Sequence, residues 1–148
     1  MVQMRVVTKL SGVDQVIRDF PDQVDQIKRD VLEEMAKEVA LNSPVWGGDY
    51  VTNHQIGLRS GSFTASKTGT PFPPRLSESE AETKRQEGYE SLLRDISAIN
   101  IKSENFVIRN RMTYAGIVEG NYGVYAQARK SAAIAVREAV ERARRTGR

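Results

Sequence analysis

The feature that most constrains the fold is an apolar stripe between residues 24 and 39. Its members recur at intervals of three and four: Val24, Ile27, Val31, Met35 and Val39, widened by Leu32 and Ala36. This spacing predicts an amphipathic α-helix, and the run Asn42-Ser43-Pro44 ends it. A helix of this kind must bury its stripe against another layer. The rest of the chain must therefore supply that layer.

Two further helices are predicted. One begins at Ser77, which forms a capping-box pattern with Glu80, and pairs at i,i+4 are expected between Glu80 and Lys84 and between Glu90 and Arg94. The last helix begins near Tyr125 and has an alanine-rich apolar face, which permits close approach of a sheet or another helix.

Short alternating patterns predict strands. They occur at residues 3–10, more weakly at 58–66, and at 97–110, where two apolar runs flank a turn and predict a β-hairpin. Short antiparallel strands with two long helices, from the stripe above and the C-terminal run, predict an α+β fold: a small antiparallel sheet packed against two long helices.

Two polar segments are expected to be long loop arms of this single domain, residues 1–148. Residues 46–57 and 67–76 are too polar or too proline-rich for a core, and they carry Trp46, Tyr50 and Phe72. Long loops in compact domains are usually functional or disordered. We expect these arms to contact neighbouring subunits and to be poorly ordered in an isolated monomer.

Composition excludes several classes of protein. There is no cysteine, so disulfides and thiolate chemistry are excluded; the start of the chain lacks a signal-peptide pattern, and no window is apolar enough to cross a membrane. We therefore expect a soluble protein without membrane contact. The last twenty residues carry seven basic and two acidic side chains, a local charge of 7 − 2 = +5, against +3 for the whole chain.

The basic end has two interpretations. It can face phosphates or anionic lipid, or it can simply complement the dipole of a helix C-terminus. The candidate residues for a DNA-channel or basic face are Arg137, Arg142, Arg144 and Arg145.

No catalytic, metal or cofactor motif is found in the sequence. His54 is the only histidine, with no spacing typical of a zinc site and no nucleophile elbow near it. The glycines around residue 48 lack the lysine and hydroxyl of a phosphate loop. A small hydrolase or lyase built on His54, Asp49 and Glu119 is a remote alternative, so we expect no enzyme activity, no cofactor and no metal.

The stretch RNRMTYAGIVEGNYGVYAQ, residues 109–127, stands out because it gathers Tyr114, Tyr122, Tyr125 and Glu119 where the secondary structure changes. Tyrosines are favoured anchors at protein interfaces. They also pack ordinary cores with their hydroxyls bonded. The sequence leaves open whether they form a contact surface or the start of a helix core.

Two patches together resemble a family. SPVWGG followed by GLRSGSF resembles the first signature of the head–tail joining, or tail-completion, proteins of tailed bacteriophages, and NRMTYAGIVEGNYG resembles their second. The resemblance spans about residues 24–145. The matching residues are Ser43, Pro44, Val45, Gly48, Leu58, Arg59, Ser62, Asn110, Tyr114, Ala115, Val118, Glu119 and Gly120. Gly47 departs from the usual threonine, and nine residues separate Gly48 from Leu58 where the family commonly has one.

The resemblance implies a structural virion protein of the tail or neck, assembled in the host cytoplasm. It would form a ring, a hexamer in expectation, that joins or terminates the tail at the head connector and leaves a channel for DNA. Its implied partners are further copies of itself, portal-side connector or stopper proteins, the tail tube protein, and DNA bound without sequence preference.

On this interpretation, Glu119 would fix the register by capping the following helix or by pairing with Arg59. The expected subunit or partner interface comprises Trp46, Tyr50, Arg59, Phe72, Tyr114, Glu119, Tyr122 and Tyr125. The alternative is a small basic nucleic-acid-binding module that uses the C-terminal helix.

Overall fold

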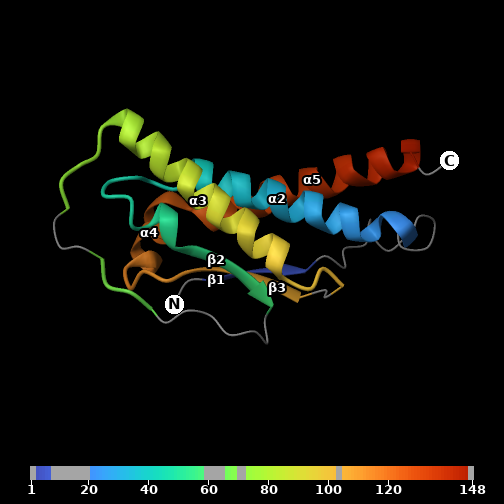
Figure 1. Ribbon diagram of the computed structural model, residues 1–148, viewed down its shortest axis with the longest axis horizontal. Coiled ribbons are helices and arrows are strands. Elements are labelled where there is room, and N and C mark those ends of the chain that lie inside the picture. Colours follow the sequence, from blue (N-terminus) through green and yellow to red (C-terminus); the bar gives the residue numbers. More distant parts are fainter. Residues whose placement is uncertain (1–2, 8–20, 59–65, 70–72, 103–104, 147–148) are drawn as a thin grey trace.

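The computed structural model describes residues 3–7, 21–58, 66–69, 73–102 and 105–146 of the chain (Figure 1). Its strands are β1 (Gln3–Val7), β2 (His54–Leu58) and β3 (Asn105–Asn110), and its α-helices are α2 (Val24–Asn42), α3 (Glu78–Ala98), α4 (Ala115–Tyr122) and α5 (Val124–Thr146). Two short 3-10 helices, η1 (Pro21–Gln23) and η2 (Val51–Asn53), precede α2 and β2. The predicted strand at 58–66 lies largely outside the described residues.

The sheet has three strands in the order β1-β3-β2, and both pairings are antiparallel. The last strand in the sequence is therefore the central one. Phe106 and Ile108 of β3 are buried in the core. Ile108 lies opposite Ile56 of β2.

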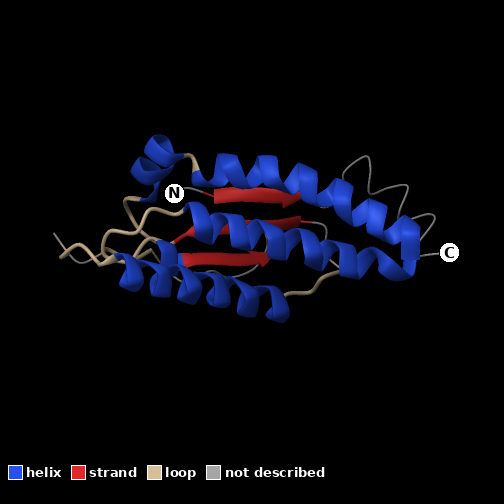
Figure 2. Cartoon of the chain, turned by 90° about the horizontal axis from the view of Figure 1, so that it is seen from above, coloured by secondary structure: helices blue, strands red, loops and turns tan. Residues whose placement is uncertain are grey.

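The three long helices form a layer on one face of the sheet (Figures 1 and 2). α2 packs against both α5 and α3, and α3 also packs along β2. Ala128, Ala139 and Ala143 of α5 are buried where it approaches the core, as the alanine-rich pattern predicted. The backbone N–H of Ile56 on β2 donates to Asp95 Oδ2 of α3 (3.0 Å), which helps to seat α3 beside this edge strand.

The α+β prediction is confirmed, and so are its individual helices. α3 begins with the predicted capping box between Ser77 and Glu80. The expected Glu80–Lys84 pair is replaced by Lys84–Glu87 at 3.2 Å. α3 is a third long helix in the layer, beside the two on which the fold prediction was based.

Two local predictions are wrong. The first strand of the hairpin at 97–110 does not form, because α3 continues to Ala98 and residues 101–102 form a turn. Residues 46–57 are not a continuous loop arm, because η2 and β2 occupy residues 51–58. In both places tertiary burial decides: Val51 and Ile56 are buried within the expected loop, and Ile101 is buried in a turn instead of in the expected strand.

Candidate functional site

The site that stands out is at one end of the layer, where residues 43–54 meet residues 110–125. They contain SPVWGG of the first signature and NRMTYAGIVEGNYG of the second, and the fold brings them together around β2, β3 and the start of α5. Residues 59–63 of the first signature lie outside the described residues. The meeting point has a buried polar part and an exposed aromatic part.

The buried polar network consists of Ser43, His54, Asn110 and Tyr125, each no more than 2% exposed. His54 Nε2 lies 2.8 Å from Ser43 Oγ. His54 Nδ1 lies 2.9 Å from the Tyr125 hydroxyl and 3.3 Å from Asn110 Nδ2. One histidine therefore links the end of α2, strands β2 and β3, and the first turn of α5.

The hydrogen bonds assign a tautomer to His54. Ser43 Oγ donates to the carbonyl of Val39 (2.6 Å), so this oxygen accepts a hydrogen bond from Nε2–H of His54. Nδ1 is then the acceptor for Tyr125 and Asn110. Burial lowers the pKa of His54 to about 3, because desolvation disfavours the imidazolium.

The network is built for structure. Although a serine and a histidine are in contact, the serine hydrogen is bound to a backbone carbonyl and both side chains are buried. Both ends of the Asn110 side-chain amide are also hydrogen-bonded, since Nδ2 donates to the Tyr50 carbonyl and Oδ1 accepts from Met112 N–H. This arrangement can fix the ends of four elements relative to one another.

His54, Asp49 and Glu119 do not converge on a common hollow in the described part of the chain. The Glu119 carboxylate accepts from Tyr125 N–H (3.0 and 3.1 Å) and Ala126 N–H (3.2 Å). It thus caps the first turn of α5, which is one of the two roles expected for it. Gly123, with φ of +59°, makes the sharp turn between α4 and α5. Arg59, the other expected partner, lies outside the described residues.

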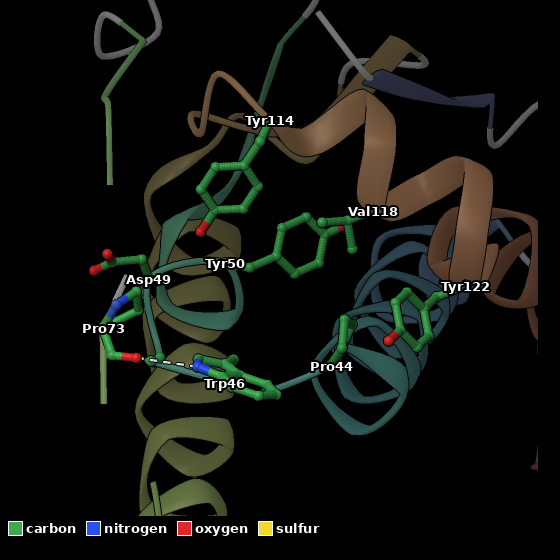
Figure 3. A pocket seen from close by; sticks show the side chains of 10 residues that line it. Pro44, Trp46, Asp49, Tyr50, Pro73, Tyr114, Val118 and Tyr122 are labelled. Atoms are coloured by element: carbon green, nitrogen blue, oxygen red, sulfur yellow. Dashed lines mark hydrogen bonds between the residues drawn. The ribbon is translucent and has the colours of Figure 1, made fainter. Parts of the chain in front are cut away.

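The exposed part is a hollow of about 270 Å³ beside the network (Figure 3). We call it the aromatic hollow, and it is lined by Pro44, Trp46, Gly47, Gly48, Asp49, Tyr50, Pro73, Tyr114, Val118 and Tyr122. Tyr114, Val118 and Tyr122 recur every four residues and so present one side of α4 to it. Pro44, Pro73 and Val118 were not expected at an interface, because they line the hollow together only where segments distant in the sequence meet.

Trp46 is exposed over 58% of its surface but is held in place. Its indole N–H donates to the Pro73 carbonyl (3.0 Å), and its own carbonyl accepts from Leu76 N–H (3.0 Å). The Arg75 guanidinium lies 5.2 Å from the ring centroid, within cation–π range. The described end of the 67–76 segment is thereby fastened to the hollow.

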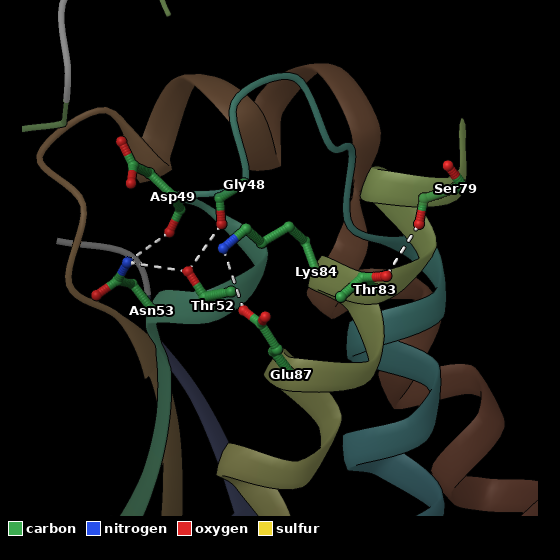
Figure 4. Close-up of polar contacts among 8 residues, drawn as sticks. All are labelled: Gly48, Asp49, Thr52, Asn53, Ser79, Thr83, Lys84 and Glu87. Carbon is green, nitrogen blue, oxygen red and sulfur yellow. Dashed lines mark hydrogen bonds and ion pairs between the residues drawn. The ribbon is translucent and has the colours of Figure 1, made fainter. Parts of the chain in front are cut away.

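The loop that contains Gly48 and Asp49 packs against α3 (Figure 4). Gly48 has φ of +91°, a conformation that favours glycine, and a Cβ there would lie 3.0 Å from the Lys84 side chain. Thr52 Oγ1 donates to the Gly48 carbonyl (2.8 Å), and Asn53 Nδ2 donates to the Asp49 carbonyl (2.6 Å). These bonds hold the loop in one shape, which makes the hollow preformed.

The tyrosines expected at an interface divide between the two parts. Tyr122 is 56% exposed and Tyr114 is half-buried at the hollow, whereas Tyr125 and Tyr50 are buried at 1% and 4%. Tyr50 and Tyr125 are therefore not exposed anchors in the described structure, because burial of their rings outweighs display where a helix start packs on the sheet. A role for them at a subunit interface stays a prediction. Phe72 lies outside the described residues.

The candidate basic face lies on α5. Arg137, Arg142, Arg144 and Arg145 are all exposed, and Arg142 is paired with Asp30 of α2 at 3.6 Å. Glu138 and Glu141 are exposed among them. The face is therefore mixed rather than uniformly basic.

In the described residues, no group of three or more acidic, histidine or cysteine side chains is placed to hold a metal ion, and none of the helices described has the length and apolarity to cross a bilayer. Comparison of the chain with protein-family models, curated proteins and solved structures gives no match.

Proposed function

We propose that this protein is a structural component of a tailed-bacteriophage virion. It would form a ring in the neck that joins or terminates the tail at the head connector and leaves a channel for DNA. The ring would contact connector or stopper proteins on one side and the tail tube on the other.

One observation supports the proposal most strongly. SPVWGG (residues 43–48) and NRMTYAGIVEGNYG (residues 110–123), two of the stretches that resemble the head–tail joining proteins, are distant in the sequence but contribute to the same end of the molecule. Ser43 and Asn110 belong to the buried polar network, and Pro44, Gly48 and Tyr114 line the aromatic hollow beside it. A preformed hollow with exposed Trp46 and Tyr122 has the residue types that serve as anchors in protein–protein contacts.

The test is the mass of the purified protein in solution, by light scattering over a concentration series, with negative-stain images of the same samples. We expect a closed ring of about six copies with a central hole, as the resemblance implies; a head-to-tail contact gives such a ring when its rotation closes. A protein that stays monomeric at every concentration and binds DNA tightly would contradict the proposal.

A second candidate is a nucleic-acid-binding module based on the exposed arginines of α5. It predicts an affinity for duplex DNA whose logarithm falls linearly with the logarithm of salt concentration. The exposed glutamates on the same helix argue against tight binding, and weak contacts suit DNA that must pass through a channel. Salt titration of DNA binding by the full chain separates the two functions.

A further inference from the structure

The aromatic hollow has a size and chemistry that suit protruding side chains of another protein. At about 270 Å³ it lies just below the roughly 300–1,000 Å³ typical of small-molecule sites. Its walls are aromatic, and the side chain of Asp49 lies at its rim (Figure 3). Aromatic faces beside a carboxylate attract cations that carry an aliphatic stem, as arginine and lysine do.

Asp49 lines the hollow and Glu119 lies near Tyr50, while the Lys84 side chain packs against Gly48 on the same wall. Burial raises the pKa of the Tyr114 hydroxyl, and the nearby Asp49 carboxylate raises it further. Burial likewise raises the pKa of Tyr50, with Glu119 as the next cause. The Arg75 guanidinium stacks on the indole of Trp46 but does not line the hollow.

The same chain carries a complementary surface on α5. Lys130, Arg137 and Arg144 are exposed and recur every seven residues, close to two helical turns, so they lie along one side of the helix. Ile134, 54% exposed, lies between the first two. We call these four residues the basic strip; Glu141 also lies along it.

The hollow and the strip cannot meet within one molecule. The hollow is formed at the end where α4 lies, and α5 runs from there to the opposite end, where the C-terminus lies (Figure 1). The side of α5 that faces the core is packed against α2, and its buried residues belong to the hydrophobic core. Two different patches far apart on one chain are what a head-to-tail contact between copies requires.

We propose that the aromatic hollow of one copy binds the basic strip of α5 of the next copy. The inference rests on the proposed function, because it names the surfaces through which the ring closes. Trp46 and Tyr122 would bury their exposed faces against Ile134 and the stem of Arg137, and Asp49 would lie close to the guanidinium.

Two variants test the contact, each lacking one surface. Arg137→Glu with Arg144→Glu keeps the hollow and reverses the strip. Trp46→Phe with Tyr122→Lys keeps the strip and spoils the hollow. All four positions are exposed, so both variants should fold, which circular dichroism and thermal unfolding check. Lys37→Glu with Arg94→Glu is the matched control, because it makes the same charge change at exposed positions of α2 and α3.

Trp46 is the only tryptophan, so tryptophan emission in a mixture reports only on the copy that retains the hollow. Each variant alone should self-associate at least about tenfold more weakly than the wild type. Mixed together, they should form a one-to-one complex by light scattering, with a change in Trp46 emission. The Lys37/Arg94 control should assemble like the wild type.

The outcomes separate this inference from the proposed function. If both double variants form the same rings as the wild type, the inference is overturned and the proposed ring function still stands. A one-to-one complex of the two variants, with a wild type that makes open chains and no closed rings, would support the contact and contradict the ring. Absence of any complex in the mixture, with a wild type that assembles, would also overturn the inference.

Discussion

The buried polar network and the aromatic hollow lie side by side and share two segments of the chain, yet they differ in solvent exposure. The network fills its hydrogen bonds internally, whereas the hollow leaves Trp46 and Tyr122 exposed. Tyr125 and Tyr122 show the contrast best: they are three residues apart on either side of Gly123, and their exposed fractions are 1% and 56%. The turn at Gly123 directs one ring into the core and the other to the surface.

The comparison separates stability from recognition. Changes in the network should lower the free energy of unfolding. Changes at the hollow should leave that free energy nearly constant and alter association alone.

The largest difference is expected between Tyr125→Ala and Tyr122→Ala. Tyr125→Ala empties a buried site and removes a donor to His54, so it should cost about 3–5 kcal/mol of unfolding free energy. Tyr122→Ala should stay within about 0.5 kcal/mol, as is usual for exposed positions. Urea denaturation measures the free energy of unfolding of both variants. Similar losses of this free energy in the two would remove the distinction between the regions.

A pH dependence should follow from His54. Its pKa is about 3 in the folded protein and about 6.5 when unfolded. Between these values the unfolded chain binds a proton that the folded chain does not, so stability is full above pH 6.5 and falls as the pH drops. The slope should approach about 1.4 kcal/mol per pH unit in the middle of this window.

Denaturation at pH 7, 5.5 and 4 measures that slope, and His54→Gln is the control. This variant removes the titrating group and should show a flatter dependence, even if it is less stable at pH 7. An equal slope in wild type and variant would mean that other groups cause the acid sensitivity.

Ser43→Ala should have a smaller effect. It leaves the buried Nε2–H of His54 without its acceptor, at a cost of about 1–3 kcal/mol. Ser97 offers a matched control, because its Oγ makes the same i−4 bond, to Leu93 O at 3.0 Å, on the exposed side of α3. Ser97→Ala should change stability by less than about 0.5 kcal/mol, so the difference between the two serines measures the bond to the histidine.

The smallest effect is expected for Glu119→Gln. The side chain keeps its shape but loses the charge that caps α5, which should cost about 0.3–1 kcal/mol. Hydrogen exchange should show faster opening at Tyr125 and Ala126 while β3 stays protected. Uniform loss of protection over the whole chain would instead indicate that Glu119 supports the network rather than the helix end.

Much of the fold could be predicted because it follows from local patterns. The apolar stripe from Val24 to Val39, the capping box at Ser77 and the alanine-rich face near Ala128 each specify a helix through neighbours along the chain. β2 was not predicted, because residues 54–58 are few, offer only Ile56 and Leu58 in alternation and contain a glycine. They form a strand because β3 offers its edge and α3 supplies Asp95 for the Ile56 N–H.

The site was predicted only in part for a similar reason. Sequence singled out the tyrosines and Trp46 by residue type and proximity to a change of structure, and it anticipated that Glu119 could cap α5. Sequence gave no sign that His54 would bond to Ser43 and Tyr125, because that depends on where β2 lies relative to α5. The separation of Tyr125 from Tyr122 depends on a single glycine with positive φ.

The sequence by itself determined the α+β class, the three long helices and the concentration of basic charge at the C-terminal end, since periodicity and composition act locally. Only the tertiary structure decided which tyrosines are core and which are surface. It also decided that the lone histidine is a buried, neutral link, and that two distant segments share one end of the molecule. These outcomes depend on burial and on hydrogen bonds between residues far apart in the chain, and no short stretch of sequence contains both partners.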